Sequence, residues 1–317
     1  MVNAGYNPII IDNFSNSEPF VVKNIEKIVN QPITNYIFDY SDLKKTKDVL
    51  EKESIDGIIH FAAFKQVGES VKFPLKFYKN NVLGLIKLLE LIESERKVKH
   101  FVFSSSCTVY GNPDILPVTE TTEFKRAASP YGASKQMDEI IINDVVKVSS
   151  KLNSIALRYF NPIGAHPSAL IGELPKGVPA NLVPFITQTV AGIRDCLTVF
   201  GNDYPTKDGT CIRDYIHVVD LAKAHVKAIS YLENKPSGVH EALNIGTGKG
   251  SSVLELINCF ESVTKQKLKY KIGPRRQGDI ISTYSSATKA NKLLGWKAEK
   301  TLGDALNDAW NWQQTLR

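Results

Sequence analysis

The sequence predicts an α/β fold with a doubly wound parallel sheet, followed by a smaller C-terminal α/β domain. Two observations support this prediction. Short runs rich in Ile, Val and Phe alternate with longer helical patterns through the first half of the chain, as in sheets whose parallel strands are buried on both faces. The 317 residues, of which 43% are hydrophobic and 23% charged, are enough for one large or two modest globular domains.

The elements of the first half are expected in strict alternation. The apolar runs PIIID, NYIFDY, DGIIHFA, HFVFSSS and SIALRYFN predict strands at 8–12, 35–40, 56–62, 100–106 and 154–161. The stretches between them predict helices, one ending near Val29 and the others over 41–53, 74–94 and 131–150. We expect residues 1–166 to form the first domain and 167–317 the second, with a segment near 209–246 returning to the first.

The second half is less regular. Residues 166–184 are rich in Pro and Gly, which suits loops that shape a ligand pocket and a plain surface excursion equally well. Shorter strands and helices follow. Residues 303–316 predict an amphipathic helix near the end of the chain.

Charge and cysteine content exclude several classes of protein. The net charge is +6, but the lysines are spread along the chain without an arginine-rich arm, so no nucleic-acid partner is expected. The four cysteines form no C-x-x-C pair, which predicts reduced thiols, a cytoplasmic location and no metal site. No apolar run approaches the roughly 20 residues of a membrane-spanning helix, so no membrane partner is expected.

Asp12 stands at the carboxyl end of the first expected strand. In dinucleotide-binding, Rossmann-like sheets, an acidic residue at the end of the second strand follows a G-x-G-x-x-G loop by about 20 residues. Counting back from Asp12 runs beyond residue 1. Either Asp12 is a strand-end turn residue, or the sequence begins one strand–turn–helix unit late. In the second case residues 1–6 would be the tail of a helix with Gly5 at its C-cap, and one strand position of the sheet would lack a neighbour.

A second glycine-rich stretch, NIGTGKGSS at 244–252, is a candidate phosphate loop. It follows an expected strand and opens an expected helix, but Ser251 occupies the place of the last glycine in G-x-G-x-x-G. We therefore expect a tight strand-to-helix turn in which Ser251 or Ser252 is the N-cap.

The pattern Y-x-x-x-K occurs at 40–44, 131–135 and 231–235, and context separates these three pairs. Ser129 and Pro130 are a favourable helix start, which puts Tyr131 and Lys135 one turn apart on the same helix face. This helix follows a strand that ends in three serines, at the carboxyl edge where open α/β sheets bind ligands. The other two pairs have no serine cluster nearby.

The chemistry of this pair is that of a general base. A free phenol has a pKa of about 10, too high for a base at neutral pH. An adjacent ammonium favours the phenolate, so Lys135 is expected to lower the pKa of Tyr131. Ser106 would hold a substrate hydroxyl within reach of the phenolate oxygen.

With these residues, the sequence resembles the extended short-chain dehydrogenases/reductases and, within them, the UDP-glucose (UDP-galactose) 4-epimerases. The resemblance runs from Ile9 to near the last helix. Its most specific segments are IRDYIHVVDLA and RYFNPIGAHPS, together with IIIDNFSNS, IIHFAAFKQVGES, SPYGASK, VPANLVPF and RRQGD.

The resemblance implies an NAD-dependent isomerase that interconverts UDP-galactose and UDP-glucose through transient oxidation at sugar C4. NAD would stay bound while Tyr131 takes the proton of the 4-hydroxyl, and the 4-keto sugar would turn over before it is reduced on its other face. Lys135 would also bond the nicotinamide ribose, and Ser106 would complete the catalytic set. The first domain would then bind NAD and the second the UDP-sugar.

The resemblance also implies which residues contact each ligand. Besides Tyr131 and Lys135, the implied cofactor contacts are Asp12, Asn13, Asn16, Ser17, Asp39, Phe61, Ala62, Ala63, Lys65, Asn80 and Tyr159. The implied UDP-hexose contacts are Ser106, Thr108, Tyr159, Phe160, Asn161, Asn181, Leu182, Thr198, Phe200, Arg213, Arg276, Asp279 and Thr283.

Some of these residues have simpler interpretations. Arg213 and Arg276 would suit the diphosphate as forked donors, although IRDYIH could equally hold a buried ion pair in a strand. Asn161 before Pro162 could be a turn residue. The small side chain of Thr283 would leave space for an N-acetyl group, so UDP-GalNAc and UDP-GlcNAc are expected as further substrates.

The sequence also departs from the pattern of these epimerases. The glycine-rich loop is absent, Ala63 replaces a usual glycine, Ala180 a usual asparagine and Cys107 a common alanine. The alternatives are a nucleotide-sugar 4,6-dehydratase, a reductase, or a non-catalytic remnant without cofactor. A dehydratase would need an acidic pair just after Ser106, where Cys107 and Thr108 stand. The resemblance further implies a homodimer formed through the helices near 73–94 and 130–150.

Overall fold

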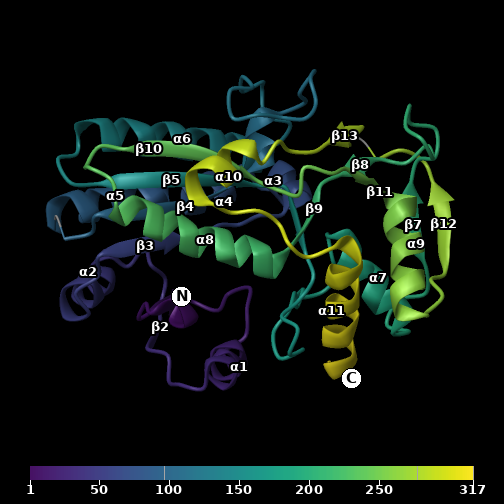
Figure 1. The fold of residues 1–317 in the computed structure, drawn as a ribbon, viewed down its shortest axis with the longest axis horizontal. Coiled ribbons are helices and arrows are strands. Elements are labelled where there is room, and N and C mark those ends of the chain that lie inside the picture. Colours follow the sequence, from purple (N-terminus) through teal and green to yellow (C-terminus); the bar gives the residue numbers. More distant parts are fainter. Residues whose placement is uncertain (96, 277, 317) are drawn as a thin grey trace.

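The computed structural model describes residues 1–95, 97–276 and 278–316. Its centre is a parallel four-stranded sheet in the order β10-β5-β4-β3. Helices α5 (Gly84–Glu95) and α6 (Pro130–Val148) cover one face and α8 (Val218–Glu233) covers the other (Figure 1), which confirms the predicted α/β class. The strands are β3 (Gly57–His60), β4 (His100–Ser106), β5 (Asn153–Tyr159) and β10 (His240–Ile245).

Alternate residues of the central strands serve the two helical layers. Val102 and Ile155 belong to the core that includes α8, whereas Phe101 and Ala156 belong to the core that includes α5 and α6. Successive side chains of a strand point to opposite faces. A strand that is covered on both faces must therefore be apolar without interruption. This is why the uninterrupted apolar runs in the sequence predicted this sheet correctly.

The N-terminal strands stand apart from this sheet. β1 (Ile10–Asp12) pairs in parallel only with β2 (Asn35–Ile37), and α1 (Phe20–Val29) connects them. Within the described residues, neither strand shares a ladder with β3, so the expected doubly wound sheet is divided in two. In the described residues β1 has a strand on one side only, as in the second of the two cases for Asp12, and Asp12 also accepts the Phe14 N–H, as a turn residue would. Gly5 adopts φ 83° at the C-cap of a short 3₁₀ turn, also as expected.

The long helix expected over 74–94 is interrupted. A π-helical segment, Tyr78–Leu83, separates α4 (Pro74–Phe77) from α5. Asn81 in this segment explains its position, because the amide bonds the backbone N–H and carbonyl of Phe64 at 2.9 and 3.1 Å and the hydroxyl of Ser134 at 3.1 Å. The sequence pattern missed this break, although π segments often occur at functional sites.

The C-terminal part has its own core. Helices α7 (Leu182–Val190), α9 (Val253–Thr264) and α11 (Leu302–Thr315) contribute to one apolar cluster with β7 (Leu197–Phe200), which pairs with β12 (Tyr270–Gly273). The remaining elements are the turns Val2–Ala4 and Cys107–Tyr110, α2 (Leu43–Lys52), α3 (Val67–Lys72), α10 (Thr288–Leu294), β6 (Asn161–Ile163), β8 (Ile212–Arg213), β9 (Tyr215–His217), β11 (Ser251–Ser252) and β13 (Ser282–Thr283).

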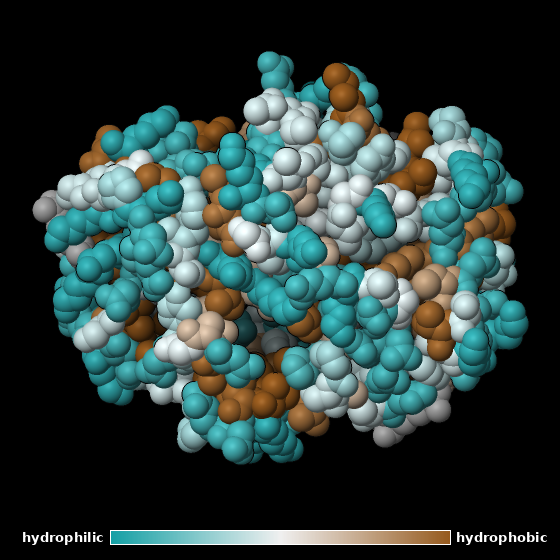
Figure 2. Space-filling view, viewed as in Figure 1, coloured by the Kyte–Doolittle hydropathy of each residue, from teal (hydrophilic) through white to brown (hydrophobic). Residues whose placement is uncertain are grey.

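The surface is hollowed between α8 and the region of β1, β2 and α1, with a hydrophobic area over α1 (Figure 2). No helix among the described residues is long and apolar enough to cross a membrane.

Candidate active site

The three serines at the end of β4 each contact a different residue of α6. The Ser104 carbonyl accepts a 2.7 Å hydrogen bond from Lys135 Nζ, and the Ser105 hydroxyl donates to Glu139. The Ser106 side chain lies near the phenol of Tyr131 and interacts with it. The helix begins as predicted, because the Ser129 hydroxyl caps it by accepting the Gly132 N–H at 3.1 Å and Pro130 is its first residue. The predicted catalytic trio is therefore brought together.

The acidity of Tyr131 differs from the sequence-based expectation. Burial raises the pKa of Tyr131 to about 12, and the interaction with Ser106 lowers it only in part. The predicted lowering by Lys135 is absent because the ammonium is directed to the Ser104 carbonyl and lies 4.4 Å from the centroid of the Phe103 ring. Burial in turn lowers the pKa of Lys135 itself. In the protein alone, the phenol is therefore protonated at neutral pH.

Two acidic residues of α6 were missed by the sequence analysis. Glu139 accepts from Arg158 Nη2 at 2.7 Å and Nε at 3.0 Å, and both side chains are buried. Asp138 is 1% exposed, and its Oδ1 has no hydrogen-bond partner. The sequence analysis placed both residues in a helix but did not predict that they would be buried, because carboxylates are rarely found on the core face of a helix.

Two orphaned hydroxyls lie among the residues expected to bind substrate. Thr108 and Thr283 each have a buried Oγ1 without a hydrogen-bond partner. Thr283 lies opposite Arg213 in the β13–β8 pair. Buried polar atoms are normally satisfied, so these two hydroxyls each have an unused capacity for a hydrogen bond.

The glycine-rich stretch 246–250 binds a carboxylate of the protein itself. The N–H groups of Thr247 and Gly248 donate to buried Asp214 at 2.8 and 3.2 Å. A Cβ at Gly246 would lie 2.4 Å from that carboxylate. Ser252 caps α9 in a capping box with Glu255, which confirms the predicted turn.

Arg213 is not part of a buried ion pair. Its Nη1 donates to the Ile212 carbonyl at 2.8 Å, and none of the described carboxylates forms an ion pair with it. The neighbouring Asp214 is instead held by the 246–250 loop, so that alternative is wrong. Arg276 pairs with Asp279 at 2.6 Å and lies 5.7 Å from the centroid of the Phe200 ring, so it adjoins two other expected substrate contacts.

Glu173 connects the two expected ligand regions, and sequence reasoning missed it. Its Oε1 accepts from Asn181 at 2.6 Å and from Lys65 at 3.4 Å. Asn181 was expected on the substrate side and Lys65 on the cofactor side. Lys176, three residues further on, contacts the carbonyls of Phe14 and Ser15 and so ties the Pro/Gly-rich stretch to the loop after β1.

The acidic residues expected near the cofactor are Asp12, which is the last residue of β1, and Asp39, which follows β2. Asn13 donates to Asp39 at 3.0 Å, and Asp12 accepts the N–H of Phe14 at 2.7 Å. Asp39 and Asn80 line one surface pocket of about 260 Å³. Exposed residues of this group are Asn13, Asn16, Asp39, Phe61, Ala62 and Lys65, whereas Asp12, Ser17, Ala63 and Asn80 are half-buried.

His225 is a further residue that the sequence did not indicate. Its Nδ1 donates to the Leu221 carbonyl at 2.8 Å, so Nε2 must accept the hydroxyl of Tyr159, with which it forms a very short contact. Burial lowers the pKa of His225 to about 4, which keeps the ring neutral. The exposed ring of Phe61 lies 4.7 Å from His225 between centroids, so both rings border the expected nicotinamide region.

Other expected substrate contacts are less accessible or less polar. Phe160 is 4% exposed and packs with Tyr110 and Val118, so its side chain does not face a ligand and only its backbone could. Asn161 begins β6 and donates its N–H to the Asp214 carbonyl, so it is a strand residue and not a turn residue. Leu182 begins α7, and Thr198 lies in β7.

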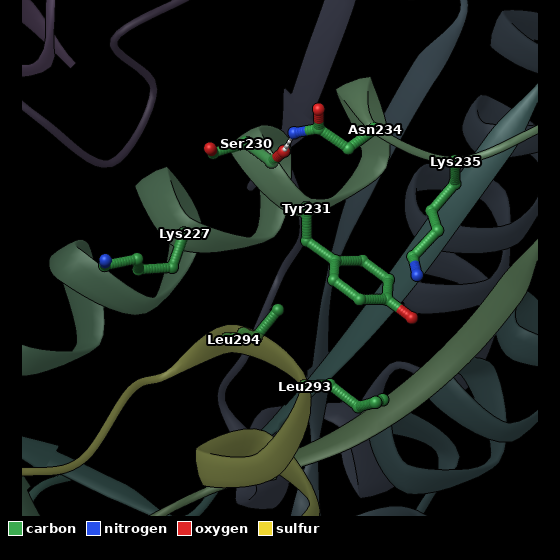
Figure 3. Close-up of a pocket in the computed structure, with 7 residues that line it drawn as sticks. All are labelled: Lys227, Ser230, Tyr231, Asn234, Lys235, Leu293 and Leu294. Atoms are coloured by element: carbon green, nitrogen blue, oxygen red, sulfur yellow. Dashed lines mark hydrogen bonds between the residues drawn. The ribbon is translucent and has the colours of Figure 1, made fainter.

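The two other Tyr–Lys pairs lack this environment. Tyr40 donates to the Asn80 carbonyl, and Lys44 is exposed. Tyr231 and Lys235 line a pocket of about 330 Å³ between α8 and α10, where the ammonium lies 4.4 Å over the ring (Figure 3).

Known proteins resemble this chain in sequence and in structure. A family model for GDP-mannose 4,6-dehydratase matches residues 1–309. UDP-glucose 4-epimerases from Dictyostelium discoideum and Bacillus subtilis are 47% and 44% identical, and each alignment covers 99% of this chain and 90% or 92% of the relative. The epimerase structure from Stenotrophomonas maltophila, with bound NAD and formylated UDP-arabinopyranose, superposes with a TM-score of 0.96 at 44% identity, covering 99% of this chain and 93% of that one.

A second structure gives the same result. The epimerase from Bifidobacterium longum, in complex with NAD⁺ and UDP, has a TM-score of 0.94 at 44% identity and covers 99% of this chain and 92% of its own. At this identity and coverage, together with the serine, tyrosine and lysine geometry, the chain belongs to the UDP-glucose 4-epimerase family of the extended short-chain dehydrogenases/reductases.

Proposed function

We propose that this protein is an isomerase that interconverts UDP-galactose and UDP-glucose with NAD as bound cofactor. The observation that carries this proposal is the contact of Ser106 with Tyr131 at the carboxyl end of β4, one helical turn from buried Lys135. Relatives at 44–47% identity over 99% of this chain bear the name UDP-glucose 4-epimerase, which supports it.

The residues of this chain fit NAD at several points. Asp12 at the end of β1 and Asp39 just after the neighbouring β2 offer carboxylate acceptors for ribose hydroxyls. The ammonium of Lys135 donates one hydrogen bond to the Ser104 carbonyl. Its remaining protons could donate to the hydroxyl oxygens of a second ribose. When bound, NAD supplies the oxidising and reducing equivalent at sugar C4.

The protein side chains would divide the remaining work. Tyr131 takes the proton from the sugar 4-hydroxyl and later returns it, while Ser106 holds that hydroxyl and the phenol in one hydrogen-bonded line. Because burial raises the pKa of Tyr131 to about 12, the positive charges of the loaded site must stabilise the phenolate. Thr108 and Thr283 provide unsatisfied hydroxyls for the sugar, and Arg213 provides a cation for the diphosphate.

The test compares two tyrosines with the same local sequence pattern. Tyr131→Phe should reduce UDP-galactose epimerisation by about 10²–10⁴-fold, the usual contribution of a general acid–base group. Tyr231→Phe is the matched control and should leave the rate unchanged. NAD content of each purified protein is measured by absorbance. Equal rates for the two variants, or a wild-type protein that neither binds NAD nor epimerises, would refute the proposal.

We extend the proposal to N-acetylated sugars. Thr283 is 6% exposed and small, and it lies beside Arg213 at the substrate side. Thr283→Tyr should abolish turnover of UDP-GalNAc and spare that of UDP-galactose. Equal turnover of UDP-GalNAc by both proteins would contradict this part.

We further propose a cytoplasmic homodimer in which residues 1–166 hold NAD and 167–317 hold mainly the UDP-sugar. Support for the dimer comes from apolar side chains on adjacent helices α3, α4 and α6, where Val71, Leu75 and Ile140 are 61%, 80% and 54% exposed. Light scattering should give a dimer for the wild type and for Val178→Glu, an exposed loop position, and a monomer for Ile140→Glu. The free cysteines suit a reducing compartment.

A further inference from the structure

Lys135 is a buried cation without a direct counter-ion. It is 3% exposed, and its Nζ makes one hydrogen bond, to the Ser104 carbonyl, and one cation–π contact, with Phe103. No carboxylate among the described residues forms an ion pair with it. A buried charge is costly unless another charge or several hydrogen bonds compensate it, so a compensating group is needed nearby.

Two carboxyl groups on α6 are close enough in sequence to serve. Glu139 is already neutralised, since it accepts two hydrogen bonds from Arg158 and one from Ser105. Asp138 is 1% exposed, and its Oδ1 has no hydrogen-bond partner among the described residues. Asp138 is therefore the carboxyl group whose charge remains to be matched.

Helix geometry puts this group beside the catalytic pair. Tyr131, Lys135 and Asp138 are spaced i, i+4 and i+7, so they lie on one face of α6. Asp138 acts electrostatically on both Tyr131 and Lys135. Lys135 and Asp138 are buried on this face, and Tyr131 is half-buried.

The other titratable groups around Lys135 and Asp138 cannot replace Lys135 as the matching cation. From the loop after β2, the Tyr40 hydroxyl is engaged with the Asn80 carbonyl, and Asp39 carries the same sign of charge. From β3, His60 is buried, and burial together with the charge of Lys135 lowers its pKa to about 3. Lys135 is thus the cation to which Asp138 responds in the described residues.

We propose that Asp138 is a positioning residue that supplies the counter-charge of Lys135 and keeps its ammonium protonated beside Tyr131. Burial lowers the pKa of Lys135 and raises that of Asp138, and each charge offsets part of the shift of the other. The role in turnover rests on the proposed function, whereas the charge pairing does not.

A double-mutant cycle on stability tests the pairing without using activity. Urea unfolding is measured for wild type, Asp138→Asn, Lys135→Met and the double variant. Asp138→Asn should lower the unfolding midpoint more, or raise it less, when Lys135 is present than in the Lys135→Met background. Equal effects in both backgrounds would overturn the proposal.

The same helix offers a matched control. Asp144 and Lys147 have the same three-residue separation and a 3.3 Å ion pair, but they are 65% and 63% exposed. The corresponding cycle with Asp144→Asn and Lys147→Met should show almost no coupling. If Asp138→Asn does not fold, ¹³C NMR of the wild-type Asp138 carboxyl decides: a group that stays protonated from pH 5 to 9 contradicts the proposal, and one that ionises together with the ¹⁵N signal of Lys135 supports it.

A pH profile tests the consequence for turnover. In Asp138→Asn the alkaline limb of kcat should move down by about one pH unit, a loss of about tenfold on that limb, with little change in KM. Asp138→Glu, which keeps the carboxylate, should restore the wild-type profile. Superimposable profiles of wild type and Asp138→Asn would overturn the proposal. Failure of the wild type to epimerise would refute the proposed function and leave the cycle to decide the pairing.

Discussion

The wall formed by β4, β5 and α6 differs sharply from the β1–β2 unit, residues 10–40. In the wall, six of the seven residues of β5 are buried, and Arg158 and Glu139 form a buried ion pair. In the β1–β2 unit no strand residue is fully buried, and Val22 is the buried residue of α1. The expected proton-handling groups lie on the wall, and several expected cofactor groups lie on the unit.

The difference in burial between the wall and the β1–β2 unit indicates which part of the site must be rigid. Proton transfer depends on hydrogen-bond geometry between Tyr131, Ser106 and the sugar, and the wall fixes those atoms through dense packing. Contacts to a cofactor far from the reacting atoms tolerate movement, because they contribute binding and not alignment. Regions with few buried apolar contacts also open at lower free energy.

The largest expected effect is on the buried ion pair of the wall. Glu139→Gln leaves the Arg158 guanidinium buried without its counter-charge and should lower the free energy of unfolding by about 3–5 kcal/mol. The control is Glu18→Gln in the β1–β2 unit, whose partner Lys176 lies 3.2 Å away at an exposed site; it should cost less than about 1 kcal/mol. Chemical denaturation measures both, and similar losses would remove the distinction between the regions.

An intermediate effect is expected in hydrogen exchange. The amides of β1 and β2 should exchange at least about tenfold faster than those of β4 and β5, since few buried side chains oppose their opening. Exchange followed by mass spectrometry of the peptides covering 8–14 and 34–40 against 100–106 and 153–159 gives the comparison. Equal protection would show that the two sheets open together as one unit.

The smallest effect concerns the charge of Asp39. Burial opposes ionisation, but hydrogen bonds from Ser41 and Asn13 hold the pKa of Asp39 below its ordinary value. A carboxyl group with a lowered folded pKa stabilises the protein above its unfolded pKa, near 4, and this contribution is lost as the pH falls through the folded pKa. Asp39→Asn should thus cost well under about 1 kcal/mol at pH 7 and flatten the acid limb of the stability curve. An unchanged acid limb in urea titrations would contradict this assignment.

The sequence predicted the layered fold and the start of α6 because both depend on local rules. Uninterrupted apolar runs indicate buried parallel strands, and Ser129-Pro130 is a sufficient helix signal. The same rules failed at the π segment around Asn81, where contacts to Phe64 and Ser134, both distant in sequence, override a regular helical pattern. They also gave no sign of His225 or Glu173, since isolated polar residues in apolar or loop sequences carry no periodic signal.

By itself, the sequence determined which side chains are available and on which face of an element each lies, because strand and helix periods are fixed by backbone geometry. Only the tertiary structure decided how charges are distributed among them. In the folded protein Arg158 pairs with Glu139, the 246–250 loop donates hydrogen bonds to Asp214, and Lys135 donates to the Ser104 carbonyl. The tertiary structure also raised the pKa of Tyr131, because burial, which depends on the whole fold, outweighs the effect of neighbours one helical turn away.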